Sequence, residues 1–342
     1  MKRIHFDEYL AKKYQLEVIK EEGNEIVEGK LTPKDKTKKT IIIVNAIPRF
    51  AFEENYADNF GLQWNKFKST QLDSVSGLPF TENRFWKNTK WTKEELRGKT
   101  VLEVGSGAGR FTEILLKAGA KVVSFDYSNA VEANYQNNSH KGDLFLFQAS
   151  LYDLPLDDNL FDFVFCYGVL QHTPDPIRAY RAIFSKLRPG GKISIDYYYK
   201  TWKPTPYSTP KYVWRPITTK MNPQTLLKII EFYIPLYLPI NTMIRRIPKI
   251  GRYLIALIPI PCWNYSGSGL SKKQVVEWAI MDTFDALGAR YDIPKTRDEV
   301  RQMADLPENE SLEVFFGSNG VVANALKKIE ESSINNKVDL VP

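Results

Sequence analysis

The sequence predicts an α/β fold with a doubly wound, seven-stranded sheet, and three observations support this. Residues 99–197 alternate between short apolar runs and helical patterns, as in a parallel sheet with helices on both faces. A glycine-rich turn follows the first apolar run. Near the C-terminus, Asn319-Gly320 separates two further apolar runs, which predicts a terminal antiparallel hairpin.

Each element of this sheet has its own pattern in the chain. The predicted strands are 99–105, 121–126, 144–149, 161–167 and 192–197, and the hairpin strands are 312–316 and 321–326. The predicted helices are 110–118, a helix from about residue 129, 176–187, and 271–287 with Ser271 as its N-cap. Right-handed crossovers between parallel strands place these helices on both faces.

Three regions flank or interrupt this predicted domain, which spans 100–342. Residues 1–50 form a leader with one predicted strand at 41–44. Residues 51–99 are rich in aromatic side chains and predict short helices that pack on a neighbouring domain. Residues 197–270 contain ten of the 20 prolines and nine of the 18 tyrosines, which predicts an inserted cap whose apolar stretches are interrupted by proline.

The charge is concentrated in that cap. The chain of 342 residues has a net charge of +7, and residues 197–270 alone hold ten Lys or Arg and one acid, Glu231. This segment carries +9, so the rest sums to about −2. A phosphate-bearing ligand or a membrane interface would suit such a cap, and a solvated basic face is the plain alternative. Nucleic acid is disfavoured because no RNA-binding module is recognisable.

Composition limits the compartment and the metal chemistry. The two cysteines, Cys166 and Cys262, cannot form a disulfide framework or a four-cysteine zinc site. The first residues are charged, and no apolar run reaches the roughly 18 residues of a transmembrane helix. We therefore expect a cytoplasmic protein without a bound metal.

The chemistry lies in the turn after the first strand. Gly105, Gly107 and Gly109 follow the apolar run 101–104, and a helical pattern begins at Arg110. Glycine lets the backbone approach a ligand, and the N-terminus of a helix attracts a negative group such as a carboxylate. Asp126 ends the next strand, where an acid accepts hydrogen bonds from ribose hydroxyls in nucleotide-binding folds.

The spacing of the glycines argues against a dinucleotide. A dinucleotide site requires glycines at relative positions one, three and six, and the sixth position here is Arg110. With Gly109 at position five, the pattern is G-x-G-x-G.

Residues 100–196 resemble the core of class I S-adenosylmethionine (SAM)-dependent methyltransferases, which have a Rossmann-like fold. Five motifs match in order: the glycine loop, Asp126, residues 148–155, residues 161–172 and Leu187-Arg188-Pro189-Gly190-Gly191. The resemblance implies that Gly105, Gly107 and Gly109 border the methionine part of SAM, that Glu103 is buried beneath the loop, and that Asp126 holds the ribose. It further implies that Tyr127, Ser150 and Leu151 flank the adenine and that Tyr167 lies near the methyl group. Many relatives carry Asp at position 150, so a backbone contact is expected there.

Methyl transfer to a hydroxyl needs a group that removes a proton, and His172 is the candidate base. It follows the fourth strand at the carboxyl edge of the sheet, where ligands of such sheets bind, and a usual pKa near 6.5 suits the task. The alternative is that His172 only orients its loop. Acceptor contacts are expected from Asp196, Tyr197 and Tyr199 at the end of the fifth strand, and from Asp282 and Asp285.

The flanks resemble those of one bacterial subgroup of these enzymes, which is associated with surface polysaccharide pathways. The match lies in residues 47–50, 55–64 and 278–296. Relatives carry paired cysteines in a zinc-ribbon-like leader, whereas this leader has none. The resemblance implies a small-molecule O- or N-methyltransferase acting on a phosphate-bearing sugar or glycan intermediate. A methyltransferase of RNA or protein and a non-catalytic SAM-binding partner are the alternatives.

Overall fold

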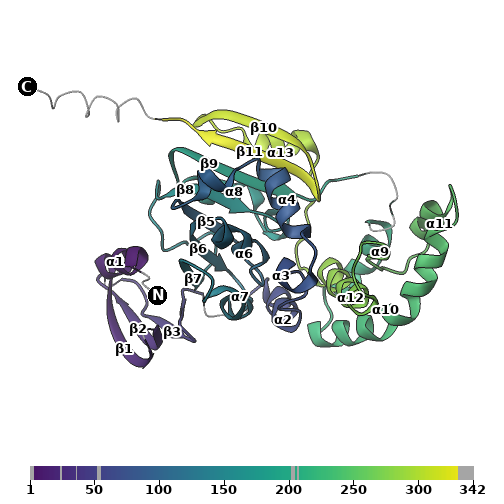
Figure 1. Ribbon diagram of the computed structural model, residues 1–342, viewed down its shortest axis with the longest axis horizontal. Coiled ribbons are helices and arrows are strands. Elements are labelled where there is room, and N and C mark those ends of the chain that lie inside the picture. The colour runs from purple at the N-terminus through teal and green to yellow at the C-terminus, as the bar shows by residue number, and fades with distance from the viewer. Residues whose placement is uncertain are drawn as a thin grey trace, which may run out of the picture.

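The computed structural model describes residues 4–23, 25–35, 37–51, 55–201, 205 and 208–329. Its centre is one eleven-stranded sheet with the order β1-β2-β3-β4-β7-β6-β5-β8-β9-β11-β10 (Figure 1). The sheet is therefore longer than the predicted seven strands, because the leader adds four strands beside β7.

The central strands confirm the predicted doubly wound domain. Strands β5 (Thr100–Val104), β6 (Lys121–Asp126), β7 (Leu144–Gln148), β8 (Phe161–Cys166) and β9 (Leu187–Tyr197) are parallel. The hairpin of β10 (Asn309–Gly317) and β11 (Gly320–Lys327) completes this part of the sheet, with β11 antiparallel to β9. Strand β9 begins five residues earlier than predicted, because Leu187 already pairs with Phe161 ahead of an irregularity.

Alternating side chains of these strands form a core on each face of the sheet. Leu102 and Val104 pack with α8 (Pro176–Phe184) and α13 (Arg297–Ala304), whereas Val101 packs with α6 (Arg110–Lys117) and α7 (Val131–Asn138). Because successive residues of a strand point to opposite faces, one apolar strand supplies both cores. The carboxyl ends of the five parallel strands are left for a ligand.

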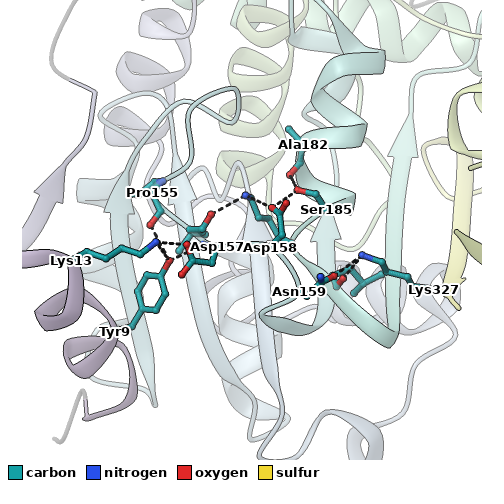
Figure 2. A network of polar contacts seen from close by, with 12 residues as sticks. Tyr9, Lys13, Pro155, Asp157, Asp158, Asn159, Ala182, Ser185 and Lys327 are labelled. Atoms are coloured by element: carbon teal, nitrogen blue, oxygen red, sulfur yellow. Dashed lines mark hydrogen bonds and ion pairs between the residues drawn. The ribbon is translucent and has the colours of Figure 1, made fainter. Parts of the chain in front are cut away.

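The leader consists of α1 (Ile4–Lys13), β1 (Tyr14–Glu22), β2 (Glu25–Pro33), β3 (Ile41–Val44) and β4 (Ile47–Arg49). The predicted strand at 41–44 is confirmed. Figure 2 shows how α1 is fastened to the central domain: the Asp157 backbone N–H donates to Tyr9 Oη at 2.7 Å, and Lys13 pairs with the Asp157 carboxylate. Tyr14, Phe50 and Phe147 pack edge to face, so the leader also joins the sheet core.

Residues 58–96 form the predicted short helices, α2 (Asp58–Lys66), α3 (Asp73–Ser76), α4 (Phe80–Thr89) and α5 (Lys93–Leu96). Phe85 of α4 is fully buried against Trp91, Phe111 and Phe165. This aromatic contact confirms that the segment packs on the central domain, and it positions α4 beside the carboxyl edge of the sheet.

The inserted cap contains α9 (Ser208–Thr218), α10 (Pro223–Arg245) and α11 (Gly251–Leu257) at one end of the molecule (Figure 1). Helices α9 and α10 pack against α12 (Lys272–Gly288), and α11 packs against α9 and α10. Contrary to the sequence prediction, Pro235 and Pro239 do not interrupt α10. Both prolines lie on the exposed side of the helix, away from its packed face. In the described part of the chain, every helix is too short or too polar to cross a membrane.

Candidate active site

A cavity of about 670 Å³ opens at the carboxyl edge of the parallel strands. Of the predicted site residues, those that line it are Gly105, Gly107, Asp126, Tyr127, Leu151, Tyr167, His172, Tyr199, Asp282 and Asp285. Glu103, Gly109, Ser150, Asp196 and Tyr197 do not. Most residues predicted for a cofactor thus meet in one cavity with those predicted for an acceptor.

The glycine loop takes a backbone conformation that only glycine adopts readily. Gly105, Gly107 and Gly109 have φ of +68°, +53° and +83°. A Cβ on Gly105 would lie 2.3 Å from a Val169 methyl, and one on Gly109 would lie 2.1 Å from Asn134 Oδ1. Gly109 is the N-cap residue of α6 rather than part of the cavity wall.

We expect Gly105→Ala to lower the free energy of unfolding by about 2–4 kcal/mol, because it combines left-handed strain with a clash. Gly98→Ala is the matched control, since Gly98 has φ of +72° and open space around a Cβ. It should lower stability by only about 1–2 kcal/mol. Urea unfolding of both variants measures the difference, and equal losses would remove the packing argument.

Glu103 lies beneath the loop, as the resemblance implied. It is buried, and its Oε2 accepts hydrogen bonds from Thr112 of α6 and Ser124 of β6. Burial raises the pKa of its carboxyl to about 7, against the lowering effect of these hydrogen bonds. Glu103 therefore ties β5 to α6 and β6 and has no contact with the cavity.

Asp126 connects the loop to the next turn. Its Oδ2 accepts a hydrogen bond from the Gly107 backbone N–H at 2.9 Å, and its Oδ1 accepts two from Ser128. Burial raises the pKa of this carboxyl, whereas the hydrogen bonds favour its charged form. An ionised carboxylate has about four acceptor positions, so Oδ2 retains capacity for a hydroxyl donor from the cavity.

The adenine-side residues are only partly in the predicted place. Tyr127 and Leu151 line the cavity. The Ser150 hydroxyl accepts from the Tyr152 backbone N–H at 3.2 Å, so its side chain closes a local turn instead. Tyr167 lines the cavity, and its hydroxyl is 2.8 Å from Ser194 Oγ on β9.

His172 is buried, and its two ring nitrogens differ in their hydrogen bonding. Its Nδ1 is 2.8 Å from the Tyr291 carbonyl oxygen, which fixes Nδ1 as the protonated donor. Among the described residues, none hydrogen-bonds the buried Nε2. Burial lowers the pKa of the ring, so His172 is neutral at pH 7 and offers an Nε2 lone pair.

The acceptor end of the cavity differs from the prediction for Asp196 and Tyr197. Asp196 is buried, pairs with Arg84 and accepts from the Gly168 backbone N–H at 2.6 Å, so it braces the cavity wall from behind. Tyr197 points into the core on the opposite face of β9. Strand alternation explains both positions, since neighbours on β9 cannot all face the cavity.

Asp282 and Asp285 do line this end of the cavity. Tyr265 donates its hydroxyl hydrogen to Asp282, and Tyr198 donates to Asp285 at 3.4 Å. Burial raises the pKa of Asp282 to about 6, and the nearby Asp285 charge acts in the same direction. The two carboxylates therefore make this part of the cavity wall acidic.

Two cavity arginines were missed by the sequence prediction. Arg84 comes from α4, and Arg110 begins α6 directly after the glycine loop. Burial and, to a smaller extent, the neighbouring Arg84 charge lower the pKa of Arg110 to about 10. Arg110 directly follows Gly109 in the chain, and this position could have indicated that its side chain reaches the cavity. Arg84 is brought to the cavity by the tertiary packing of α4, which the sequence does not show.

The cap is tied to this site by buried polar contacts. Lys211 of α9 lines the cavity and pairs with Asp292 at 2.6 Å. Arg215, one turn later, donates to the backbone oxygens of Ala286 and Ala289 at 2.8 and 2.7 Å. The cap thus contributes a cation to the cavity and is anchored beside it.

Residues 102–195 match the family model described as methyltransferase domain. The tRNA U34 carboxymethyltransferase of Nautilia profundicola is 28% identical over 155 residues, 40% of this chain and 52% of that protein. The Campylobacter curvus protein of the same name is 30% identical over 167 residues, which cover 42% of this chain and 56% of that protein. The ubiquinone biosynthesis O-methyltransferase of Coxiella burnetii is 35% identical over 100 residues, which cover 29% of this chain and 43% of that protein. The matched region spans about half the length of these relatives.

Proposed function

We propose that this chain, which carries a class I SAM-dependent methyltransferase domain, transfers a methyl group from SAM to an oxygen or nitrogen atom of an anionic small molecule. The observation that carries the proposal is that the glycine loop, Asp126 and His172 line one cavity, and that the buried His172 Nε2 has no hydrogen-bond partner among the described residues. A volume of about 670 Å³ is within the usual range for cofactor sites.

The residues of the cavity fit SAM. The loop backbone from Gly105 to Ala108 lines the cavity, and the buried Ser106 Oγ has no hydrogen-bond partner among the described residues. These groups would hold the amino-acid part of SAM, and Asp126 would hold the ribose through Oδ2. Tyr127 and Leu151 would flank the adenine. When bound, SAM supplies an electrophilic methyl group on its sulfonium.

The chain's own contribution is alignment, exclusion of water and removal of a proton. The Tyr291 carbonyl holds His172 in the tautomer whose Nε2 accepts, and the rings of Phe60 and Tyr198 pack against it at 5.1 and 5.3 Å between centroids. His172 Nε2 would accept the acceptor's proton as the new bond to carbon forms. Packed aromatic walls keep competing water away from that nitrogen.

We propose a phosphate-bearing sugar or glycan intermediate as the acceptor. The support is the pair of cavity guanidiniums, Arg84 and Arg110, because a guanidinium matches phosphate oxygens in a bidentate geometry. The relative that acts in ubiquinone biosynthesis is by name an O-methyltransferase, which supports an oxygen acceptor. The relatives named for tRNA U34 favour a second candidate, an RNA acceptor.

Transfer of labelled methyl groups separates these functions. The purified chain is incubated with methyl-labelled SAM and with small-molecule, RNA and protein fractions of a cell extract. We expect label in a small anionic product that survives nuclease and protease treatment. Label in RNA would move the second candidate to first place, and SAM binding with no label in any fraction would indicate a non-catalytic partner protein.

A further inference from the structure

The cap helix α10 exposes apolar side chains along its outer side. Ile229, Phe232, Leu236, Ile240 and Met243 follow one another at three- and four-residue steps, so they form one stripe, the apolar stripe of the cap. Exposure is largest for three of its members, at 75% for Phe232, 62% for Leu236 and 67% for Met243. On α11, Tyr253 and Leu257 are exposed to 73% and 75%.

The opposite side of α10 is apolar as well. Leu227, Ile230, Ile234 and Leu238 are buried in the core that α10 shares with α12. A surface helix of a soluble domain normally carries polar residues on its outer side, and an apolar outer side of this extent marks an interaction surface. We therefore expect an apolar partner to cover the outward side of α10.

The charges around the stripe indicate which partner. Lys220, Lys228, Arg246, Lys249 and Arg252 are exposed on the cap, and no ion pair joins them to a carboxylate of the described residues. Glu231, the one acid between residues 208 and 270, is paired with Lys66 of α2. The surface is thus apolar, bordered by cations and free of competing acids, which is the pattern of helices that lie in an anionic membrane interface.

A groove beside the stripe extends the apolar surface inward. It has a volume of about 480 Å³ and lies between α9, α10 and residues 259–261. Trp214, Ile217 and Ile260 form one wall, and Ile229, Leu236 and Ile240 of the stripe form the other. All six side chains are exposed, so the groove opens on the same side as the stripe. Its apolar lining suits a hydrocarbon chain.

The geometry points to the apolar stripe and its groove as a docking surface for an anionic lipid bilayer. Helices α10 and α11 lie in the plane of the interface, at the end of the molecule furthest from the leader (Figure 1). Helix α9 separates the two hollows, since Tyr212 lines the main cavity and Trp214 lines the groove. Docking therefore brings the main cavity beside the membrane surface.

Sedimentation with vesicles tests the docking surface without SAM or acceptor, so its failure is distinct from failure of the proposed methyl transfer. The full chain is mixed with vesicles of phosphatidylcholine alone or of phosphatidylcholine and phosphatidylglycerol in equal parts, at low and high salt. We expect binding to the anionic vesicles at low salt and weaker binding at high salt.

Matched variants assign the binding to the cap. Phe232→Ser/Leu236→Ser should bind the anionic vesicles at least about tenfold more weakly, whereas Val75→Ser/Ile177→Ser, exposed on α3 and α8, should bind as the wild type. Lys249→Glu/Arg252→Glu should weaken binding to the anionic vesicles by about fivefold or more per residue. Lys38→Glu/Lys39→Glu, which changes the net charge equally, should weaken this binding far less.

Three results would overturn the proposal. One is no binding of the wild type to anionic vesicles at low salt. Another is equal binding by the cap variants and their controls. The third is a wild-type dimer in sedimentation velocity that Phe232→Ser/Leu236→Ser converts to a monomer, because the stripe would then be covered by a second copy of the chain. Circular dichroism confirms that each variant is folded.

Discussion

Replacing His172 with alanine is expected to lower kcat by about 100-fold to 10,000-fold while SAM affinity stays within about twofold of the wild type. The reason is that His172 lines the cavity and its buried Nε2 has no hydrogen-bond partner among the described residues, whereas Nδ1 is held by the Tyr291 carbonyl. Steady-state kinetics and calorimetric SAM titration measure the two quantities. His140→Ala is the control, since His140 is exposed.

The pH profile separates a base from a residue that only holds its loop. The groups around the ring are Asp285, Asp292, Tyr198 and Lys211, and burial is the largest influence, lowering the pKa of His172 below 6.5. Because the neutral ring is the active form, kcat should stay high below pH 6.5 and fall only as the ring gains its proton. Asp282 also titrates near 6, so the limb that disappears in the variant is the one that belongs to His172.

The same shift has a consequence for stability. A histidine with a lowered pKa in the folded state takes up its proton more readily when unfolded, so its contribution to stability is present above about pH 6.5 and is lost as the pH falls further. The free energy of unfolding of His172→Ala should therefore depend less on pH below about 6.5 than that of the wild type. Full activity in this variant, with an unchanged acid limb, would refute the base role.

The second large effect is expected for Asp126→Ala, which should weaken SAM binding by about 100-fold to 1,000-fold. The variant removes a carboxylate that would accept from the ribose, and it also removes the acceptor of the Gly107 backbone N–H. Both losses act on the same ligand, because Gly107 belongs to the loop that lines the cavity. Calorimetric titration with SAM, and with NAD as a ligand that should not bind, measures the effect.

Ser128→Ala distinguishes the ribose contact from general disruption of the turn. It removes the hydroxyl that donates a hydrogen bond to Asp126 Oδ1 at 2.7 Å, but it leaves the carboxylate and its hydrogen bond from the Gly107 backbone N–H in place. We expect at most about tenfold weaker SAM binding for this variant. If Ser128→Ala and Asp126→Ala weaken binding equally, the carboxylate acts through the turn and the ribose assignment is lost.

The parts of the fold that the sequence revealed have strong local signals. Strand-ending Asp126, the glycine loop and the Asn-Gly hairpin each depend on residues close together in the chain, and the structure confirms the elements that carry them. Ser271 caps α12 through a capping box, as its position before an apolar periodic run predicted.

The parts that the sequence did not reveal depend on tertiary contacts. Strand β4 has three residues including Pro48, so it has no recognisable strand pattern. Strand β1 has one Lys and three Glu among its nine residues, and it was not predicted from the sequence although Tyr14, Leu16 and Val18 alternate with polar residues. Arg84 reaches the cavity only because the aromatic side chains of α4 pack on the sheet. Tyr197 was assigned to the cavity from its place at a strand end, but the alternation along β9 turns it into the core.

The four strands that the leader adds to the sheet also bear on the solubility of shortened forms of the chain. Strand β7 has the sequence Leu-Phe-Leu-Phe-Gln, and a protein beginning at Lys99 would leave it as the outermost strand, with Phe147 stripped of its aromatic neighbour Phe50. An uncovered apolar edge strand is a template for association between molecules. In the full chain the outermost strand on this side is β1, whose charged side chains discourage such self-association.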